Sequence, residues 1–232
     1  MSIPETEISK NHLTIEKFRD MDYLSVEKYK IPIELMMENT GLQLSRLVVH
    51  LLTKPGNILI GVGTGNNGGG GLVAARRLAG WGYNVFLNIP NEVLHDLPKL
   101  QLERALAFGV IIQTIEKPNV FIDAYLGFSQ RLPLSDVLQE AMNKANKLSC
   151  VKISLDLPTG FNKATWDSVF KPNLILTLAA MKTELIPLLA TTQVFIADLG
   201  LPEEVYSHFD IEQPKGFRES GIVQCYINQM IE

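Results

Sequence analysis

Residues 57–79 read NILIGVGTGNNGGGGLVAARRLA, and this stretch decides the fold. It begins with the apolar run Asn57–Gly63, passes through the glycine-rich segment Gly63–Gly71 and continues into Leu72–Ala79. An apolar run that ends in glycines and is followed by a periodic apolar segment is typical of a buried strand, a turn and a helix. We therefore expect a strand over 57–63, a glycine-rich turn, and a helix over 72–79.

The same alternation continues on both sides of this stretch. The expected helices cover residues 13–29, 33–52, 97–108 and 134–147, and the expected strands cover 84–89, 110–113, 120–124, 151–155, 174–178 and 194–197. The strands are apolar throughout, as in parallel strands that are covered on both faces. The pattern predicts an α/β fold, a doubly wound and mostly parallel sheet between helices. For the tail, 210–232, we expect either an edge strand around 222–227 or a strap over a neighbour.

Composition sets limits on the class of protein. The 232 residues are 46% hydrophobic and 20% charged, so the chain can bury a proper core, and without a repeat or linker we expect a single domain over 1–232. A net charge of −4 provides no basic field, so nucleic acid is not an expected partner. Cys150 and Cys225 are far apart and have no neighbouring Cys or His, which suggests two buried thiols in a reducing compartment.

Targeting signals are not expected either. The N-terminal residues carry acids and no apolar stretch, unlike a secretory signal, and no apolar run is long enough to span a bilayer. We therefore expect a cytoplasmic protein that makes no use of a membrane.

The glycine-rich segment predicts an anion site. Free backbone N–H groups and the helix dipole meet where a strand passes into a helix, and a diphosphate fits there. Gly63, Gly65 and Gly68 also match the G-x-G-x-x-G pattern of dinucleotide-binding folds. The second strand ends without the acidic residue that would hold a ribose, which disfavours an ordinary NAD-dependent dehydrogenase. The adjacent amides Asn66 and Asn67 could hold a ligand or a cation, or could simply be turn residues.

Two aspartates follow predicted strands. Asp123 ends Val-Phe-Ile and Asp156 ends Val-Lys-Ile-Ser-Leu. The carboxyl ends of strands line the ligand crevice of an open α/β sheet, so the pair predicts a metal ligand and an acid/base, although either aspartate alone could be a helix cap. Asp198 has a similar setting but reads as structural. Lys182 could meet a phosphate or an acid, or be solvated. The histidines, which are not expected to be catalytic, are His12, His50, His95 and His208.

Five segments in a fixed order carry a resemblance to a known family. They read MENTG at 37–41, GTGNNGGGGLVAAR at 63–76, IDAYLG at 122–127, SLDLPTG at 154–160 and ADLGLP at 197–202. Over about residues 13–202 the chain resembles the NAD(P)H-hydrate epimerase family, or YjeF N-terminal-like domain. The resemblance implies a Rossmann-like three-layer α/β/α sandwich that forms a homodimer. It also implies an isomerase of metabolite repair that interconverts the R and S forms of hydrated NADH or NADPH, with a separate dehydratase acting downstream.

The resemblance also implies site residues. A monovalent cation, usually potassium, is expected at Asn67, Asp123 and Thr159. Substrate contacts are implied for Asn66, Asn67, Gly68, Gly69, Gly70, Gly127, Phe128, Ser129, Gln130, Arg131 and Asp156. Asp156 is the expected catalytic acid/base at the nicotinamide carbon that bears the hydroxyl. A cation beside Asp123 would keep that carboxylate charged, whereas Asp156, being less compensated, could exchange a proton.

The chain departs from the family pattern in two places. Gly70 stands where the glycine-rich segment of the family has an aspartate, and the segment after Gly160 is shortened, running through 161–163 towards Trp166. An alternative hypothesis is therefore a catalytically weakened or inactive member that acts as a nucleotide-binding, dimerising or ligand-sensing module. Gly70 favours this alternative, whereas the presence of Asp156 favours the enzyme.

Overall fold

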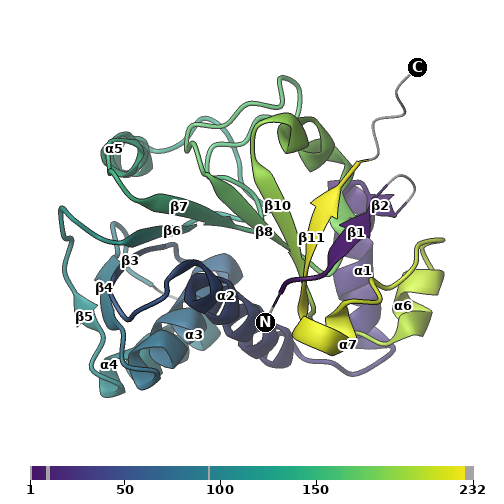
Figure 1. Cartoon of the computed structure of the whole chain (residues 1–232), viewed down its shortest axis with the longest axis horizontal. Helices are drawn as coiled ribbons and strands as arrows, with labels where there is room; N and C mark the ends of the chain where they lie inside the picture. The colour runs from purple at the N-terminus through teal and green to yellow at the C-terminus, as the bar shows by residue number, and fades with distance from the viewer. Residues whose placement is uncertain (1, 9–10, 94, 228–232) are drawn as a thin grey trace.

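A computed structural model of the chain describes residues 2–8, 11–93 and 95–227. One large sheet runs through the molecule (Figure 1). Its strands, in spatial order, are β1 (Glu5–Glu7), β11 (Ile222–Tyr226), β10 (Gln193–Ala197), β8 (Leu174–Leu178), β7 (Val151–Leu155), β6 (Val120–Ala124), β3 (Asn57–Val62), β4 (Asn84–Asn88) and β5 (Ile111–Ile112). All neighbouring strands are parallel except β10 and β11. The predicted, mostly parallel sheet is confirmed.

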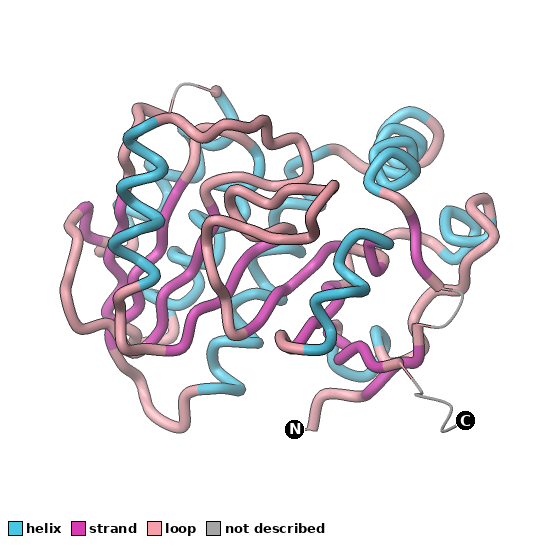
Figure 2. Tube along the Cα trace, turned by 90° about the horizontal axis from the view of Figure 1, so that it is seen from above, coloured by secondary structure: helices cyan, strands magenta, loops and turns pink. Residues whose placement is uncertain are grey.

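Helices cover both faces of the sheet, as expected for a three-layer sandwich. One face carries α2 (Ile33–Leu51), α3 (Asn66–Gly80) and α4 (Asp96–Ala107), and the other carries α5 (Asp136–Asn146) and α1 (Ile15–Glu27) (Figure 1). Beside α5, loops also lie over the strands (Figure 2). The remaining elements are short, namely β2 (His12–Leu13), β9 (Met181–Lys182), the 3₁₀ helix η1 (Thr183–Ala190), α6 (Glu203–Ser207) and α7 (Phe217–Ser220).

Three apolar clusters hold these layers together. Leu44 of α2 and Leu72 of α3 pack on Ile122 in the largest cluster, while Phe121, on the opposite face of β6, packs on Met142 of α5. The third cluster joins Phe18 and Met21 of α1 to β8, β10 and the C-terminal segment. Because successive strand residues point to opposite faces, the continuous apolar runs of these strands supply side chains to the clusters on both faces of the sheet.

The glycine-rich segment is helical, contrary to our expectation of a turn. α3 begins at Asn66, six residues before the predicted start, and the Gly69 N–H donates to the Gly65 carbonyl at 3.1 Å. The glycines are buried because other chain segments approach them closely. A Cβ atom on Gly41 would lie 2.3 Å from Val73 Cγ1, and one on Gly71 would lie 2.6 Å from the Cβ of Ala124. The glycines therefore let α3 pack tightly on α2 and β6.

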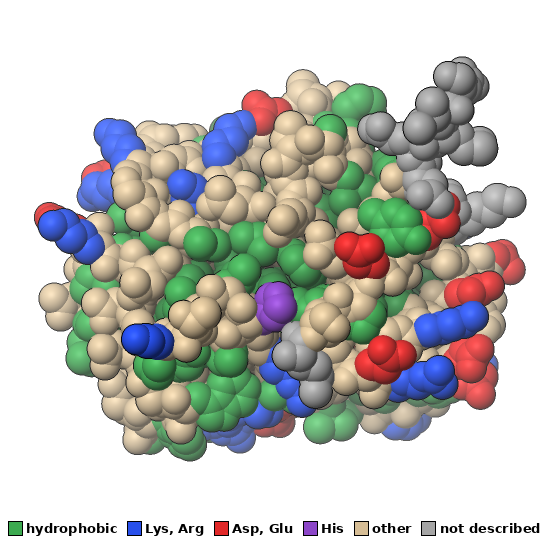
Figure 3. Space-filling view, in the orientation of Figure 1, with side chains coloured by type: hydrophobic (Ala, Val, Ile, Leu, Met, Phe, Trp, Pro, Cys, Tyr) green, Lys and Arg blue, Asp and Glu red, His purple; other side chains and the backbone are tan. Residues whose placement is uncertain are grey.

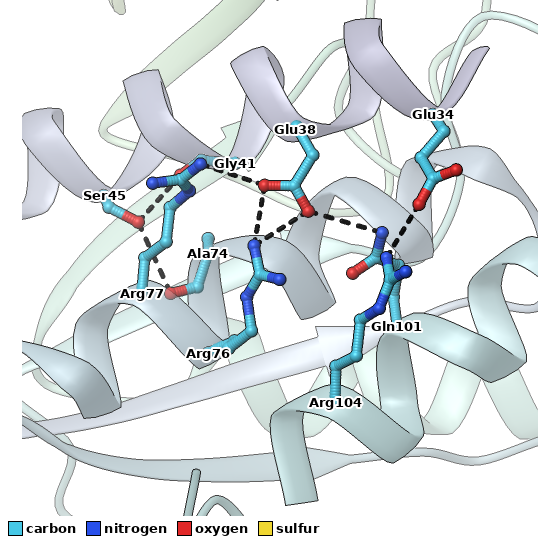
Figure 4. Close-up of polar contacts among 9 residues, drawn as sticks. All are labelled: Glu34, Glu38, Gly41, Ser45, Ala74, Arg76, Arg77, Gln101 and Arg104. Atoms are coloured by element: carbon cyan, nitrogen blue, oxygen red, sulfur yellow. Dashed lines mark hydrogen bonds and ion pairs between the residues drawn. The ribbon is translucent and has the colours of Figure 1, made fainter. Parts of the chain in front are cut away.

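A charged network also ties the three helices of this layer together (Figure 4). Glu38 of α2 accepts hydrogen bonds from Arg76 at 2.6 and 2.8 Å and from Arg77 at 2.9 Å, both on α3. Glu34 of α2 pairs with Arg104 of α4 at 2.8 Å. This network, the α2 clamp, joins the C-terminal half of α3 and the helix α4 to α2.

The termini complete one edge of the sheet. The predicted strand of the tail exists as β11, but it is not an edge strand, because β1 pairs with it in parallel. The last five residues of the tail, 228–232, lie outside the described residues. Both cysteines are unpaired; Cys225 is buried, whereas Cys150 is only partly buried.

The face in Figure 3 has hydrophobic and uncharged groups at its centre and charged side chains nearer its edges. Among the helices in the described ranges, none is long and apolar enough to cross a bilayer.

Candidate active site

The chain reverses its direction of winding between β3 and β6. From β3 it proceeds to β4 and β5 on one side, and then returns to place β6 on the other side of β3. The segments that leave the carboxyl ends of β3 and β6 therefore diverge, which opens a crevice. A pocket of about 470 Å³ lies there. Seven of the predicted site residues line it, namely Asn66, Asn67, Gly127, Phe128, Ser129, Gln130 and Asp156.

One wall of the pocket is the N-terminus of α3. Its N-cap is Gly65, with no side-chain cap, and the first hydrogen bond within the helix is made by the Gly69 N–H. The N–H groups of Asn66, Asn67 and Gly68 thus belong to the helix start, where no carbonyl of the same helix can accept them. Together with the helix dipole, they form a place suited to an anion.

The other predicted contacts of the glycine segment lie deeper. Gly68, Gly69 and Gly70 are buried, and a Cβ atom on Gly69 would lie 2.5 Å from Met37 Cε. A Cβ atom on Gly70 would lie 2.9 Å from Thr40 Cγ2. Gly69 and Gly70 thus support the pocket from behind by packing on α2, whereas Gly68 packs on the backbone of Gly63.

Asp156 is held in the pocket wall by several contacts. It follows β7 with φ 69°, in the left-handed region that non-glycine residues seldom adopt, and its N–H donates to the Leu176 carbonyl at 2.8 Å. Carboxylate oxygen Oδ2 accepts from the Phe128 N–H at 2.7 Å. Strained backbone that neighbouring contacts enforce is common at functional sites.

Lys182 contacts Asp156 from below the pocket. Its Nζ lies 2.8 Å from Asp156 Oδ1, and the two side chains are 0% and 2% exposed, respectively. The ammonium also donates to Thr177 Oγ1 at 2.9 Å and lies 3.6 Å from the ring centroid of Phe18. Our expectation that Asp156 is the less compensated aspartate is therefore wrong, because a buried cation balances its charge. Of the three roles considered for Lys182, the structure selects the contact with an acid.

Asp123 lies beneath the pocket rather than in its lining. Its oxygens accept from the Thr159 hydroxyl at 2.6 Å, the Thr159 N–H at 2.8 Å, the Ser154 hydroxyl at 2.9 Å and the Tyr125 N–H at 3.3 Å. Burial raises the pKa of Asp123 to about 6, although these hydrogen bonds oppose the rise. The structure thus brings Asp123 together with Thr159.

The third predicted cation ligand, Asn67, stands in the first turn of α3, the helix that follows β3, and β3 pairs with β6. Its amide nitrogen donates to the Leu155 carbonyl at 3.3 Å. Within the described ranges, Asp123 has no cationic side chain as a partner, and no group of three or more His, Cys, Asp or Glu residues could hold a metal ion. The available donors are therefore neutral oxygens around one carboxylate.

The segment 127–131 closes another side of the pocket. Gln130 holds this segment in place, since its side-chain oxygen accepts from the Gly160 N–H at 2.7 Å and the Phe161 N–H at 3.1 Å, while its amide nitrogen donates to the Pro158 carbonyl at 3.2 Å. Arg131 is exposed and does not line the pocket.

The shortened segment after Gly160 closes on itself outside the pocket. The Asn162 N–H donates to the Asp167 carbonyl at 2.7 Å, and the Trp166 N–H donates to the Asn162 carbonyl at 2.8 Å. None of the residues 161–167, all of which the structure describes, lines the pocket. This departure therefore lies outside the pocket lining, and so does Gly70, although Gly70 was expected to contact the substrate.

Sequence reasoning did not select an acid and a histidine that line the pocket. Asp22 of α1 and His95, the N-cap of α4, both line the pocket. Burial raises the pKa of Asp22 to about 7, and nearby Asp156 adds to the rise, whereas Lys182 opposes it. The one available signal for Asp22 was its position four residues after Phe18, which places both on the same face of the helix.

Comparison with known proteins identifies the family. The sequence model described as "YjeF-related protein N-terminus" matches residues 33–184. The NAD(P)H-hydrate epimerase of Rhodopirellula baltica is 31% identical over 86% of this chain and 88% of its own length. The protein of the same name from Dehalogenimonas lykanthroporepellens is 33% identical over 90% and 89%.

Two further comparisons concern domain arrangement and fold. A bifunctional NAD(P)H-hydrate repair enzyme of Thermofilum pendens is 30% identical over 65% of this chain but only 32% of its own length. The crystal structure of the yeast protein ynu0 superposes with a TM-score of 0.82, covering 92% of this chain and 99% of the yeast chain at 20% identity, which supports the fold alone. From the family match over 33–184 and the two long alignments above 30% identity, this chain belongs to the YjeF-related N-terminal domain family.

Proposed function

We propose that this protein is an isomerase that interconverts the R and S forms of hydrated NADH or NADPH. The observation that carries the proposal is Asp156, whose backbone is strained and whose carboxylate pairs with the buried Lys182 and lines the pocket. Relatives with about 31–33% identity along nearly the whole chain are named NAD(P)H-hydrate epimerases. The alternative of a non-catalytic module is not favoured, since the similar relatives are named as enzymes.

For substrate binding, we propose that the diphosphate lies at the N-terminus of α3. Its support is the set of N–H groups at Asn66, Asn67 and Gly68 that have no acceptor within the helix. Residues 127–130 and Asp156 would then contact the nicotinamide part of the molecule, because these residues line the pocket beyond the helix start. Gly69 and Gly70 serve this site through packing.

Asp156 is the proposed acid/base at the carbon that bears the hydroxyl. Its Oδ2 is occupied by the Phe128 N–H, and its Oδ1 contacts Lys182 without accepting a well-aligned hydrogen bond from any described residue. A carboxylate oxygen with an unused lone pair in a pocket is suited to proton transfer with a bound hydroxyl. Lys182 is a positioning residue, since it holds the carboxylate rather than the substrate.

A monovalent cation, most simply potassium, fits the proposed set Asn67, Asp123 and Thr159. The donors are an amide, a carboxylate and a hydroxyl oxygen, the ligands that hard cations prefer. The buried charge of Asp123, which has no cationic partner among the described residues, is the observation that supports a cation here. When bound, the ion would balance this charge and order the start of α3.

The proposed setting of the enzyme is a cytoplasmic homodimer that works before a separate dehydratase. Support for the coupled step comes from the names of bifunctional repair enzymes, such as that of Thermofilum pendens, in which the matched region is about a third of the protein. Sedimentation equilibrium would measure the proposed dimer directly.

An epimer-exchange assay tests the proposed function. A mixture enriched in the R form of hydrated NADPH is incubated with the protein, and chromatography follows the R and S populations. Wild type should reach the equilibrium mixture faster than the spontaneous background, whereas Asp156→Asn should be slower by about 10²–10⁴-fold. Asn is preferable to Ala because it keeps a polar partner for Lys182. Asp198→Asn, at another strand end, is the matched control and should keep the wild-type rate. Exchange no faster than background in wild type would contradict the proposal.

A further inference from the structure

The pocket has a second aspartate, Asp22, which faces it from a separate element. Asp22 lies on α1, outside the matched residues 33–184, whereas Asp156 follows β7. Both line the same cavity of about 470 Å³. α1 buries Phe18 and Met21 in the core, so Asp22 stands at the border between the buried face of the helix and the pocket.

Aromatic contacts dock α1 onto the residues that hold Asp156. The ring of Phe18 lies 3.6 Å from Lys182 Nζ and meets the Phe128 ring edge-on at 5.3 Å between centroids. Lys182 is the ion-pair partner of Asp156, and the Phe128 N–H is its hydrogen-bond donor. Because Asp22 is one helical turn beyond Phe18, this docking brings the second carboxyl group to the same end of the pocket.

The two aspartates share one buried cation unequally. Lys182 is in direct contact with Asp156, whereas Asp22 forms no ion pair among the described residues. Loss of water raises the pKa of Asp22 to about 7, so this carboxyl carries a proton for much of the time at neutral pH. Two carboxyl groups of the same type that are placed in different environments are suited to opposite roles as acid and base.

We propose that Asp22 is a second catalytic residue, which donates a proton to the substrate hydroxyl while Asp156 accepts one from water. The inference rests on the proposed epimerase function and deepens it. Exchange of R and S moves a hydroxyl from one face of a ring carbon to the other, which calls for proton transfer at both faces. Two carboxyl groups from different walls of one pocket, α1 and the end of β7, meet this requirement.

The step balances without any further reactant. The hydroxylated carbon is bonded to the ring nitrogen. Asp22 protonates the hydroxyl oxygen, the C–O bond breaks with release of water, and the nitrogen lone pair forms a C=N bond. Water then adds to the opposite face and gives its proton to Asp156, and the electron pair returns to nitrogen. Asp22 is left ionised and Asp156 protonated, which is the state needed for the reverse reaction. Loss of a proton from Asp156 to solvent and gain of one by Asp22 restore the starting state.

The pH profile gives this proposal a specific signature. The charged groups whose fields reach Asp22 are Lys182 and Asp156, and His95 lines the same pocket. Since Asp22 must start protonated, the exchange rate of wild type should fall as the pH rises through about 7. In Asp22→Asn this alkaline fall should be absent, because the group that titrates is gone.

The test compares Asp22→Asn with Asp20→Asn, the same change at an exposed position of the same helix. We expect Asp22→Asn to slow exchange by about 10²-fold or more, with the affinity for hydrated NADPH measured by calorimetry changed less than about threefold. Asp20→Asn should match wild type. Asp22→Glu should recover part of the rate, since it restores a carboxyl group. Above pH 7, Asp22→Asn should be no less stable than wild type, because it removes a buried charge.

Each outcome has one meaning. If wild type catalyses exchange and Asp22→Asn has the same rate and pH profile, the role of Asp22 is overturned while the epimerase function stands. A rate loss matched by an equal loss of affinity, or a rate that Asp22→Glu does not recover, would also overturn it in favour of a structural role. No exchange above background in wild type would remove the proposed function itself, and the role of Asp22 with it.

Discussion

The ammonium of Lys182 and the carboxylate of Asp156 lie 2.8 Å apart, with side chains that are 0% and 2% exposed. A buried ion pair contributes little net stability, because both charges have lost their water, but removal of one partner leaves the other charge buried without compensation. Asp156 and Lys182 therefore depend on each other for the stability of the fold as well as for the geometry of the pocket.

A double-mutant cycle should reveal this dependence. Lys182→Met should lower the free energy of unfolding by about 3–5 kcal/mol, since it leaves Asp156 alone in the core. Lys182→Met combined with Asp156→Asn should be more stable than Lys182→Met by itself, although it carries one change more. Urea unfolding of wild type, both single variants and the double variant measures the coupling. Free energies that simply add would show that the two charges do not interact.

Removal of the proposed cation should lower thermal stability. An ion that binds only the folded state at ten times its Kd stabilises by about 1.4 kcal/mol, so replacing potassium by a bulky organic cation at equal ionic strength should lower Tm by about 3–5 °C. The difference should vanish in Asp123→Asn and persist in Asp198→Asn, whose carboxylate instead accepts from the Gly200 N–H. Equal melting temperatures in the two salts would count against the cation.

The packing of α2 on α3 should make Gly41 far less replaceable than Gly65. A Cβ atom on Gly41 would lie 2.3 Å from Val73 Cγ1 and 2.8 Å from the Ala74 backbone nitrogen, whereas nothing lies within 4 Å of a Cβ atom on Gly65. Gly41→Ala should therefore destabilise by about 1–3 kcal/mol, and Gly65→Ala by under about 1 kcal/mol. Denaturant midpoints at constant m values would measure both. If both variants lost a similar free energy of unfolding, α2 and α3 would be able to move apart at little cost, contrary to this prediction.

Thr40 should decide whether position 70 accepts the aspartate of the family pattern. Gly70 lies within α3 and its backbone is not in the left-handed region, so a side chain is restricted only by space. Because its Cβ atom would lie 2.9 Å from Thr40 Cγ2, Gly70→Asp alone should be destabilised, and adding Thr40→Ala should restore most of the stability. If the double variant were as unstable as Gly70→Asp, a residue other than Thr40 would be what excludes a side chain at position 70.

The strands were predictable because burial on both faces of the sheet determines which residue types they contain. β6, β7 and β8 have the bounds that their apolar runs indicated, since parallel strands covered on both faces need apolar residues at every position. The start of α3 was not predictable in this way. Four consecutive glycines disfavour a helix by about 1 kcal/mol each, and only contact with α2 and β6 makes a helix of them.

The site was predictable to the extent that motifs contain it. Asp156 and the Asn66–Asn67 pair were found from their positions after strands, because the ends of parallel strands share one edge of the sheet. Lys182 was one candidate partner of an acid, but its pairing with Asp156 was not predicted, since it is brought there by β9, a strand of only two residues. Asp22 was not found because its spacing from Phe18 was its one signal, and an acid on an amphipathic helix is taken for part of the solvated face until the helix is docked.

The α2 clamp restricts how the pocket can open. Because Glu38 and Glu34 join α2 to both α3 and α4, these three helices should move as one rigid body, and the pocket walls that they carry keep a constant spacing. Opening of the pocket then requires motion on the opposite side, which α1 and residues 127–130 form. In hydrogen exchange, we expect the amides of 127–130 to exchange faster than those of α2 and α3. Substrate would then enter beside a mobile segment and bind against helices that keep their positions.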